Sequence, residues 1–441
     1  MILRARNGDV IAFDESGLIL RLSDQVIADI AARTGLGARP VAPPADLDAW
    51  NAWEMGDWLR FEAHLPPFPA PRTYRRRREG GSILADAPGP LLGLLTIGGP
   101  AASDTYAGPA AFPNHVLAPA DDLGAQGAAG TVLARPVDRL QALTERTQGS
   151  ATADAVLAAR HRDGRAMPLI CVRAETAAAP LVASLAEGAA VANAAAAIGS
   201  FTAIAETLGT RAEMLATVLD LAEDDVTSNG TAFASGVFAL VDRIDALCHA
   251  RGMREAPFLL RFPNDPARLR ALWQIAVHPA GRRITVPCPS YAFARDAFGW
   301  LTEAGAADQA SMDAAALEEL SARRRWVCPT MLLAERQRYA IIATFDALAP
   351  LAIDRADPFF AGEGYGFVLS CGSEALSLKS IEVDPSDRRR LVLFPGQALP
   401  EGPLTLSYAN GRPGALRDHW RHPTGGPTLR RWALPSVLEV R

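Results

Sequence analysis

The sequence predicts an α/β protein in which a parallel-sheet domain follows an N-terminal module and precedes a C-terminal antiparallel β-sandwich. Short apolar runs alternate with helical patterns between residues 86 and 350, which is typical of a parallel sheet with connecting helices. Apolar and polar residues alternate singly between residues 351 and 441, whereas proline- and arginine-rich stretches mark the first 85 residues. We therefore expect three domains, at residues 1–85, 86–350 and 351–441.

Residues 1–85 are expected to form an attachment or oligomerisation module. The segment 9–36 (DVIAFDESGLILRLSDQVIADIAARTGL) predicts a short hairpin followed by an amphipathic helix. Trp50, Trp53 and Trp58 lie between two proline-rich spacers, and they form either a small core of their own or a surface buried against a partner. The run Arg75–Ser82 (RRRREGGS) predicts a linker whose arginines are either solvated or docked on an acidic partner.

The middle domain alternates strands and helices. Strands are predicted by four apolar runs, at residues 89–99, 167–175, 214–224 and 256–265. Helical patterns lie between them, at residues 136–147, 151–165, 193–210 and 233–252. Strands joined by helices of this length imply a parallel sheet that is covered on both faces.

The last domain has the pattern of an antiparallel β-sandwich. Period-two alternation occurs at residues 364–371, 376–384, 389–396 and 402–410, with turn residues between these segments. Helical spacing is absent from this part of the sequence.

Composition argues against several classes of function. The net charge of -5 gives no support for nucleic-acid binding, and the five cysteines lack the paired spacing of a zinc site or a disulfide framework. No glycine-rich phosphate or dinucleotide motif occurs, so we expect neither a cofactor nor a bound metal. No signal peptide and no apolar run of about 18 residues occurs, so we expect synthesis in a bacterial cytoplasm and no membrane insertion.

The stretch Pro90–Gly108 (PLLGLLTIGGPAASDTYAG) has the form of an active-site entrance, because an apolar strand ends in two glycines and small polar residues follow. The next position is Pro100, which has neither a nucleophilic side chain nor a backbone N–H. The order of segments resembles the SGNH-type esterases, in particular the sialate O-acetylesterase-like proteins of phages. In that family a G-Q-S block ends the first strand, a G-E-x-D block follows a later strand, and a D-x-x-H block precedes a long helix.

When the three blocks are aligned with this sequence, the resemblance implies an esterase that has lost its catalytic residues. The G-Q-S block corresponds to Gly98–Pro100 and the G-E-x-D block to Ala222–Asp225. The D-x-x-H block corresponds to Cys328–Met331, so the nucleophile, the base and its orienting carboxylate are all replaced. An enzyme with a rearranged triad, using Ser103 and His419, is the alternative.

The C-terminal segment carries a more specific resemblance. Its residues follow the "YA…G-N-L-R-D-S…N-W-A-x-P" pattern of the closing strands in phage-type esterases. The matching residues are Tyr408, Ala409, Gly414, Leu416, Arg417, Asp418, Trp432 and Pro435. The wording "GALRDHW" with "RRWALP" resembles proteins of alphaproteobacterial phages and of gene transfer agents, the phage-like particles of that group. The chain would then be assembled into a virus-like particle and released with it.

Three functions follow from these observations. The first is a spike, fibre or tail component that docks on particle proteins through its N-terminal module, associates with copies of itself, and binds host capsular or surface polysaccharide without catalysis. The second is a carbohydrate O-acetylesterase, and the third is an inert architectural piece. For the first, the predicted sugar-binding residues are Glu223, Asp225, Tyr291, Trp300 and Trp326.

Overall fold

The computed structural model describes residues 2–4, 10–14, 17–21, 39–99, 102, 104–107, 109–131, 134–177, 186–221, 230–278 and 283–441. Two compact units make up the chain, residues 1–87 and residues 88–441.

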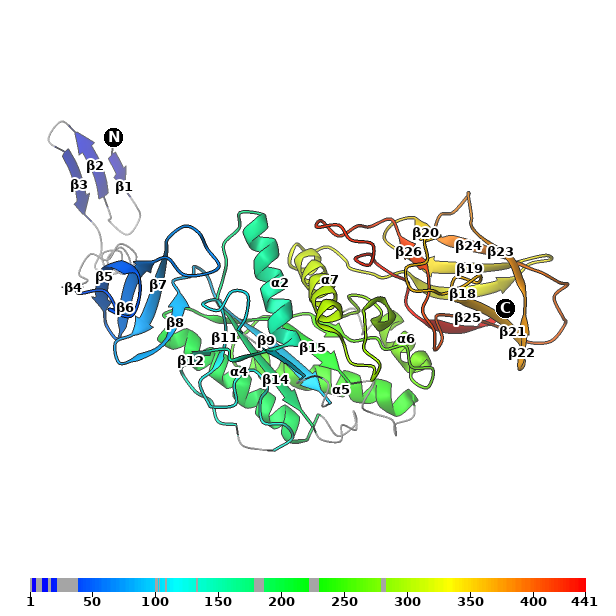
Figure 1. Cartoon of the computed structure of the whole chain (residues 1–441), viewed down its shortest axis with the longest axis horizontal. Coiled ribbons are helices and arrows are strands. Elements are labelled where there is room, and N and C mark those ends of the chain that lie inside the picture. The colour runs from blue at the N-terminus through cyan, green and yellow to red at the C-terminus, as the bar shows by residue number, and fades with distance from the viewer. Residues whose placement is uncertain are drawn as a thin grey trace. The chain divides into compact units, whose positions relative to one another are not determined.

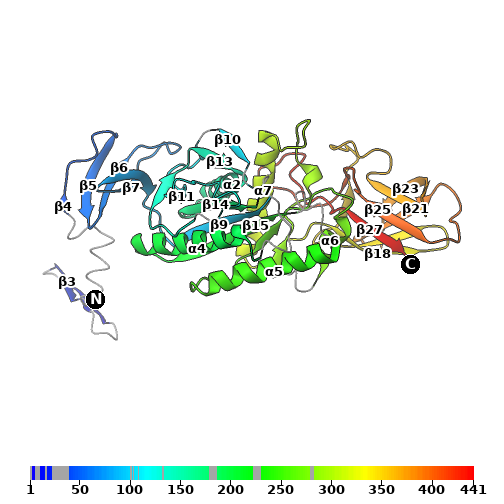
Figure 2. The same ribbon diagram turned by 90° about the horizontal axis from the view of Figure 1, so that it is seen from below.

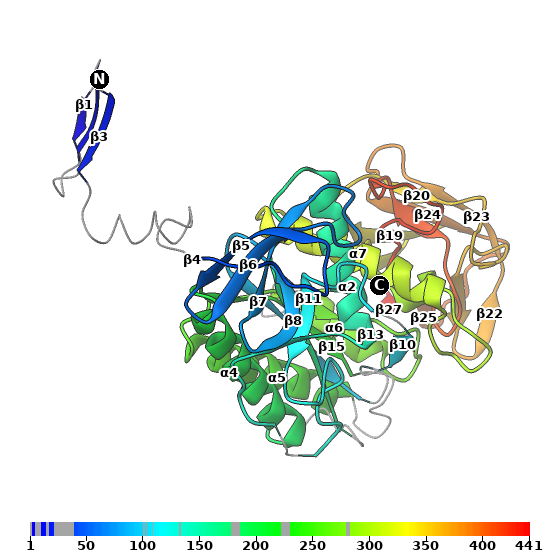
Figure 3. The same cartoon turned by 60° about the vertical axis from the view of Figure 1, so that its left-hand side comes forward.

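The first unit consists of antiparallel strands. The hairpin expected near the start is formed by β2 (Val10–Asp14) and β3 (Gly17–Arg21), and β1 (Ile2–Arg4) pairs with β2. The helix expected after it lies outside the described residues. A second sheet has five strands in chain order (Figure 3): β4 (Arg39–Pro40), β5 (Ala49–Met55), β6 (Trp58–Ala63), β7 (Arg72–Arg77) and β8 (Gly80–Ala85).

The arginine run forms a hairpin, so the predicted linker at Arg75–Ser82 is wrong. Strands β7 and β8 pair across a turn that ends in Gly80 and Gly81, whose φ angles of +104° and +97° suit glycine. Nearby carboxylates neutralise the arginines: Arg76 lies 2.9 Å from Asp46, and Arg77 lies 3.8 Å from Asp57. Strand pairing and ion pairs within the unit therefore hold a segment whose composition resembled a linker.

The second unit contains the parallel sheet, in the order β12-β11-β14-β9-β15-β16-β17. All its neighbouring strands are parallel except the edge strand β12, which runs antiparallel to β11. Every residue of the central strand β9 is buried, as its apolar run predicts. The bounds are β9 (Leu91–Gly98), β11 (Val116–Pro119), β12 (Leu140–Ala142), β14 (Ile170–Thr176), β15 (Ala212–Asp220), β16 (Phe258–Leu260) and β17 (Ile284–Thr285).

Helices cover both faces of this sheet (Figures 1 and 2). Helices α2 (Gln148–Arg162) and α7 (Glu303–Ser321) pack together on one face, and α4 (Ala189–Thr207) and α5 (Gly230–His249) pack together on the other. A shorter helix, α6 (Leu269–Val277), packs against α5. By length and composition α4 could cross a membrane, but 67% of its apolar window is buried in the protein, as in a core helix.

The helix predicted at residues 136–147 is wrong. The segment forms β12 and β13 (Glu145–Thr147), and β13 pairs with β10 (Thr105–Ala107). Thr147 then caps α2, because its hydroxyl accepts a hydrogen bond from the backbone N–H of Ser150 at 3.2 Å. Pairing with neighbouring strands overrides the helical spacing of these residues.

The C-terminal region is a mainly antiparallel sheet, which starts at Thr330 and not at residue 351 as expected. Its strand order is β22-β21-β25-β27-β18-β19-β24-β23, and only β18 and β27 are parallel neighbours. The strands surround one buried cluster that includes Ile341, Leu369, Leu393 and Leu406. The bounds are β18 (Thr330–Arg336), β19 (Ile341–Asp346), β21 (Phe367–Cys371), β22 (Glu374–Leu376), β23 (Leu378–Val383), β24 (Arg390–Pro395), β25 (Leu404–Tyr408) and β27 (Ser436–Val440), with β20 (Leu351–Ile353) paired separately to β26 (Leu416–Asp418).

Candidate functional site

A pocket lies at the carboxyl edge of the parallel sheet. Strands β9 and β15 end side by side there, with Gly98 opposite Asp220, and the Gly99 N–H donates to the Asp220 carbonyl at 3.2 Å. Open α/β sheets bind ligands at this edge. The pocket has a volume of about 50 Å³, and its lining includes the carboxylates of Asp104, Asp220 and Asp313.

The floor of the pocket is a buried polar cluster. Arg261, directly after β16, donates from Nη1 to Oδ1 of Asp313 at 2.7 Å, and Thr152 on α2 donates to Oδ2 of Asp313 at 2.8 Å. Gln309 lies one turn before Asp313 on α7 and, with its side-chain oxygen facing Arg261, accepts from Nε of that arginine at 3.0 Å. The four side chains use most of one another's hydrogen-bonding capacity, so this floor is fixed.

Two titratable groups line one wall of the pocket, Asp104 directly before β10 and Tyr106 on β10. Burial raises the pKa of Asp104. Burial and the neighbouring Asp104 carboxylate both raise the pKa of Tyr106. At neutral pH the Tyr106 hydroxyl therefore remains protonated and is available as a hydrogen-bond donor.

The rim of the pocket includes a tight hairpin at Arg295–Leu301. The Asp296 carboxylate accepts from the backbone N–H groups of Phe298 at 2.9 Å and Trp300 at 3.0 Å. The Asp296 N–H donates to the Trp300 carbonyl at 2.8 Å. Trp300 lines the pocket, and the hairpin leads directly into α7 through Thr302, whose hydroxyl caps that helix.

Of the predicted sugar-binding residues, Trp300 alone lines the pocket within the described part of the chain. Trp326 is buried, with Nε1 donating to the Pro287 carbonyl at 3.0 Å. The Tyr291 hydroxyl donates a hydrogen bond to the Ala433 carbonyl at 2.7 Å. Both side chains therefore support packing and not a ligand surface, whereas Glu223 and Asp225 lie outside the described residues.

The predicted catalytic positions do not meet at the pocket. Pro100 and Ser103 lie outside the described residues. Met331 is on β18 in the core of the C-terminal sheet, and the Cys328 thiol is buried against the Pro287 carbonyl at 3.3 Å. Burial keeps that thiol protonated by raising its pKa.

The fallback base, His419, is exposed and is not among the residues that line the pocket. The neighbouring Asp418 carboxylate binds other groups: it lies 2.5 Å from Arg431 and accepts a hydrogen bond from the Trp420 N–H at 2.9 Å. Asp418, one of the closing-strand residues that resemble phage-type esterases, therefore belongs to a buried structural ion pair.

The segment that precedes a long helix in the α/β region is Asp296–Thr302, before α7, and not Cys328–Met331. Cys328–Met331 leads into strand β18, so it is not followed by the long helix that the resemblance implies for the D-x-x-H block. In the turn before α7 the Asp296 carboxylate accepts two backbone N–H groups of the hairpin, and Trp300 and Leu301 line the pocket. The described lining of the pocket contains no histidine.

Sequence reasoning did not identify Arg261, Gln309, Asp313 or Tyr106. Arg261 could have been noticed as a charge directly after an apolar strand run, since side chains at that edge face ligands. Gln309 and Asp313 were detectable as polar residues four apart in an alanine-rich helix. Within the described residues, no group of three or more histidine, cysteine, aspartate or glutamate side chains is arranged to hold a metal ion.

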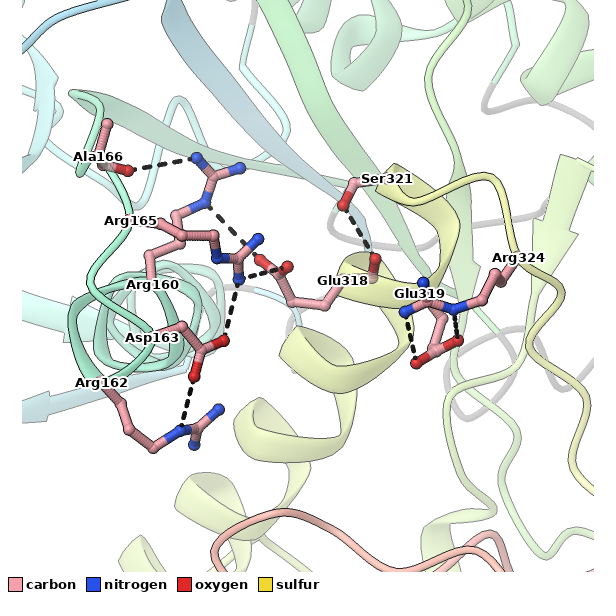
Figure 4. Close-up of polar contacts among 9 residues, drawn as sticks. All are labelled: Arg160, Arg162, Asp163, Arg165, Ala166, Glu318, Glu319, Ser321 and Arg324. Atoms are coloured by element: carbon pink, nitrogen blue, oxygen red, sulfur yellow. Dashed lines mark hydrogen bonds and ion pairs between the residues drawn. The ribbon is translucent and has the colours of Figure 1, made fainter.

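A larger hollow of about 680 Å³ lies between α2, α7 and residues 420–424. Figure 4 shows that its charged walls are paired internally: Glu318 binds Arg165 at 2.6 Å, and Glu319 binds Arg324 at 2.6 Å. His422 in its wall has a pKa lowered by burial and by Arg162. The pocket at the sheet edge is the stronger candidate, because it lies at the carboxyl ends of the parallel strands, where open α/β sheets bind ligands.

No protein-family model matches the chain, and no curated protein is similar to it in sequence. Among solved structures, a carbohydrate acetylesterase from Xanthomonas citri is similar with a TM-score of 0.54 and 14% identity, over 85% of this chain and 86% of that one. A protein from Arabidopsis thaliana is similar with a TM-score of 0.36 and 12% identity, over 52% of this chain and 99% of that one. The N-terminal part of the bacterial S-layer protein SbsC is similar with a TM-score of 0.20 and 18% identity, over 32% of this chain and 29% of that one. The first of these likenesses gives the chain an esterase-like fold.

Proposed function

We propose that this chain binds cell-surface polysaccharide through an esterase-like fold without hydrolysing it, as a structural component of a phage-like particle. The loss of catalysis is supported by the Asp296–Trp300 hairpin before α7, because the resemblance implies a D-x-x-H block with the catalytic base before a long helix. An indole cannot take a proton from a nucleophile, and the Asp296 carboxylate already accepts two backbone N–H groups.

The chemistry of the pocket supports a sugar as its ligand. The carboxylates of Asp104 and Asp220, the Tyr106 hydroxyl and Trp300 line it, whereas Arg261 and Asp313 bind each other in its floor. Carboxylate oxygens accept hydrogen bonds from sugar hydroxyl groups, and an aromatic ring packs against the C–H face of a pyranose. The similar Xanthomonas citri protein is an acetylesterase of carbohydrates, which is consistent with an ancestral sugar site. Losing the attacking groups removes turnover while affinity for the sugar is kept.

The particle role is supported by the sequence resemblance of the closing segment, residues 408–435, to proteins of phages and gene transfer agents. In this proposal the N-terminal unit docks on particle proteins, and several copies of the chain present their pockets together. Multivalent display converts weak sugar affinity into strong attachment.

The experiment uses the purified full chain, beads coated with capsular polysaccharide from an alphaproteobacterium, and a chromogenic acetate ester. We expect retention on coated but not on bare beads, and no ester hydrolysis above buffer. Asp220→Asn, which removes a pocket charge at nearly constant shape, should reduce retention. Glu335→Gln, an equal change at an exposed position on β18, is the matched control.

Two outcomes would overturn the proposal. Ester hydrolysis that is abolished by Ser103→Ala would show a working esterase with a rearranged triad. Equal retention on coated and bare beads, or equal binding to cells with and without capsule, would favour the inert architectural role.

A further inference from the structure

Two bulky apolar side chains stand exposed on the hairpin at the pocket rim. Phe298 is 86% exposed and Trp300 is 47% exposed. Clustered apolar side chains at the surface of a protein commonly mark a surface that a ligand or partner covers. Because Trp300 also lines the pocket, the exposed surface of the hairpin adjoins the pocket.

Hydrogen bonds fix the backbone of the hairpin that carries these aromatic side chains. Besides the two hydrogen bonds to the Asp296 carboxylate, the Gly299 N–H donates to the Asp296 carbonyl at 3.1 Å, and Arg295 donates to the Gly299 carbonyl at 2.5 Å. Gly299 has a φ of +88°, which a side chain at this position would strain. Leu301 anchors the end of the hairpin in the buried cluster around Phe293. A rigid platform loses little conformational entropy when it binds a ligand.

The size of the pocket indicates how much of a ligand lies outside it. Sites that enclose a small molecule commonly have volumes of roughly 300–1,000 Å³. The pocket has about 50 Å³, so it accepts a substituent or one edge of a sugar ring. The remainder of a saccharide must then lie over the rim, where Phe298 and Trp300 are.

We propose that the Arg295–Leu301 hairpin is a second sugar subsite, and that pocket and hairpin together recognise an oligosaccharide chain and not a single sugar. This inference rests on the proposed function. Trp300 packs against the sugar that enters the pocket, and Phe298 packs against the next unit of the chain. Apolar contact with pyranose C–H faces tolerates different hydroxyl patterns, so this subsite adds affinity for chain length.

The test compares single sugars with fragments of about six units, prepared by partial hydrolysis of the same capsular polysaccharide, using calorimetry on the full chain. We expect Phe298→Ala to weaken binding of the long fragments about tenfold more than binding of the single sugar, whereas Phe298→Trp keeps the preference. Tyr339→Ala is the matched control, because Tyr339 is 71% exposed on the turn between β18 and β19. Unchanged melting temperatures show that the variants are folded.

The outcomes separate this inference from the proposed function. If Phe298→Ala leaves long-fragment binding unchanged while Asp220→Asn weakens it, the hairpin is no subsite and the sugar-binding function stands. An equal loss for short and long ligands likewise excludes a second subsite. If no saccharide binds to the unmodified chain, both proposals fail, and a protein that covers the hairpin becomes the alternative.

Discussion

Asp313 on α7 and Arg261 at the end of β16 form a buried ion pair beneath the pocket, with 2.7 Å between Oδ1 and Nη1. The Asp313 side chain is fully buried and the Arg261 side chain is 11% exposed. The pair ties the helix that follows the aromatic hairpin to the edge of the sheet. Its geometry therefore determines both the stability of the unit and the position of the pocket floor.

Replacing Asp313 by alanine should destabilise the protein strongly. The change removes the ion-pair partner that hydrogen-bonds to the buried Arg261 guanidinium, and removal of one member of a buried pair costs about 3–5 kcal/mol. Urea unfolding followed by circular dichroism measures the free energy of unfolding. A decrease in the free energy of unfolding of less than about 1 kcal/mol would mean that water solvates the Arg261 side chain in the pocket floor.

The Arg165–Glu318 pair offers the contrasting case (Figure 4). It joins the loop after α2 to α7 at 2.6 Å, with side chains 41% and 20% exposed. Glu318 also lies 3.7 Å from Arg160, so Glu318→Gln removes both ion pairs. Together they should contribute no more than about 1 kcal/mol to the free energy of unfolding, and 1 M salt should reduce the difference. The same urea titration at two salt concentrations provides the measurement. A loss as large as that of Asp313→Ala would contradict the assignment of this pair as a surface interaction.

Glu175 makes stability depend on pH. Its carboxyl group is buried at the end of β14, where it accepts the Ala128 N–H at 3.0 Å and lies 3.7 Å from Arg173. Burial raises its pKa from 4.5 to about 7, against the opposing effects of the Ala128 N–H and Arg173. The folded state therefore binds this proton more tightly than the unfolded state does.

The free energy of unfolding should consequently fall as pH rises from about 4.5 to 7, by up to about 3 kcal/mol from this group. Glu175→Gln keeps an acceptor for the Ala128 N–H but has no charge to bury. Between pH 4.5 and 7 the free energy of unfolding of the Glu175→Gln variant should therefore change less than that of the unmodified protein. Parallel curves for the two proteins, measured by urea unfolding at several pH values, would show that Glu175 does not titrate there.

The sequence was informative where local pattern and burial coincide. The apolar runs around Leu94, Val172 and Val218 are central strands of the parallel sheet, because strands covered on both faces are rich in consecutive apolar residues. The sequence did not show in the same way which segments pair as neighbouring strands. Leu140 and its neighbours have helical spacing, yet they form an edge strand beside β11.

The candidate site was harder to predict, because it depends on contacts between distant segments. Arg261 and Asp313 meet although 52 positions separate them in the chain. Block order placed the catalytic positions at Cys328 and Met331, since it could not distinguish the turn before α7 from the first strand of the next sheet. The aromatic character of Trp300 and Trp326 is equal, and only tertiary packing exposes one and buries the other.

Gly98 should tolerate no side chain, because it lies at the point where β9 and β15 meet beside the pocket. A methyl group there would collide with the carbonyl oxygen of Asp220 and approach the Ala102 side chain to 3.1 Å. Backbone atoms on both strands would have to move, so Gly98→Ala should cost about 1–3 kcal/mol or more and lower the melting temperature. Gly230→Ala is the control, since the added methyl group would meet only the Ala271 side chain at an ordinary 3.6 Å, and helix α5 favours alanine. Equal melting temperatures for the two variants would mean that the strand ends are further apart than described, and the pocket would then lose the close contact that defines its inner edge.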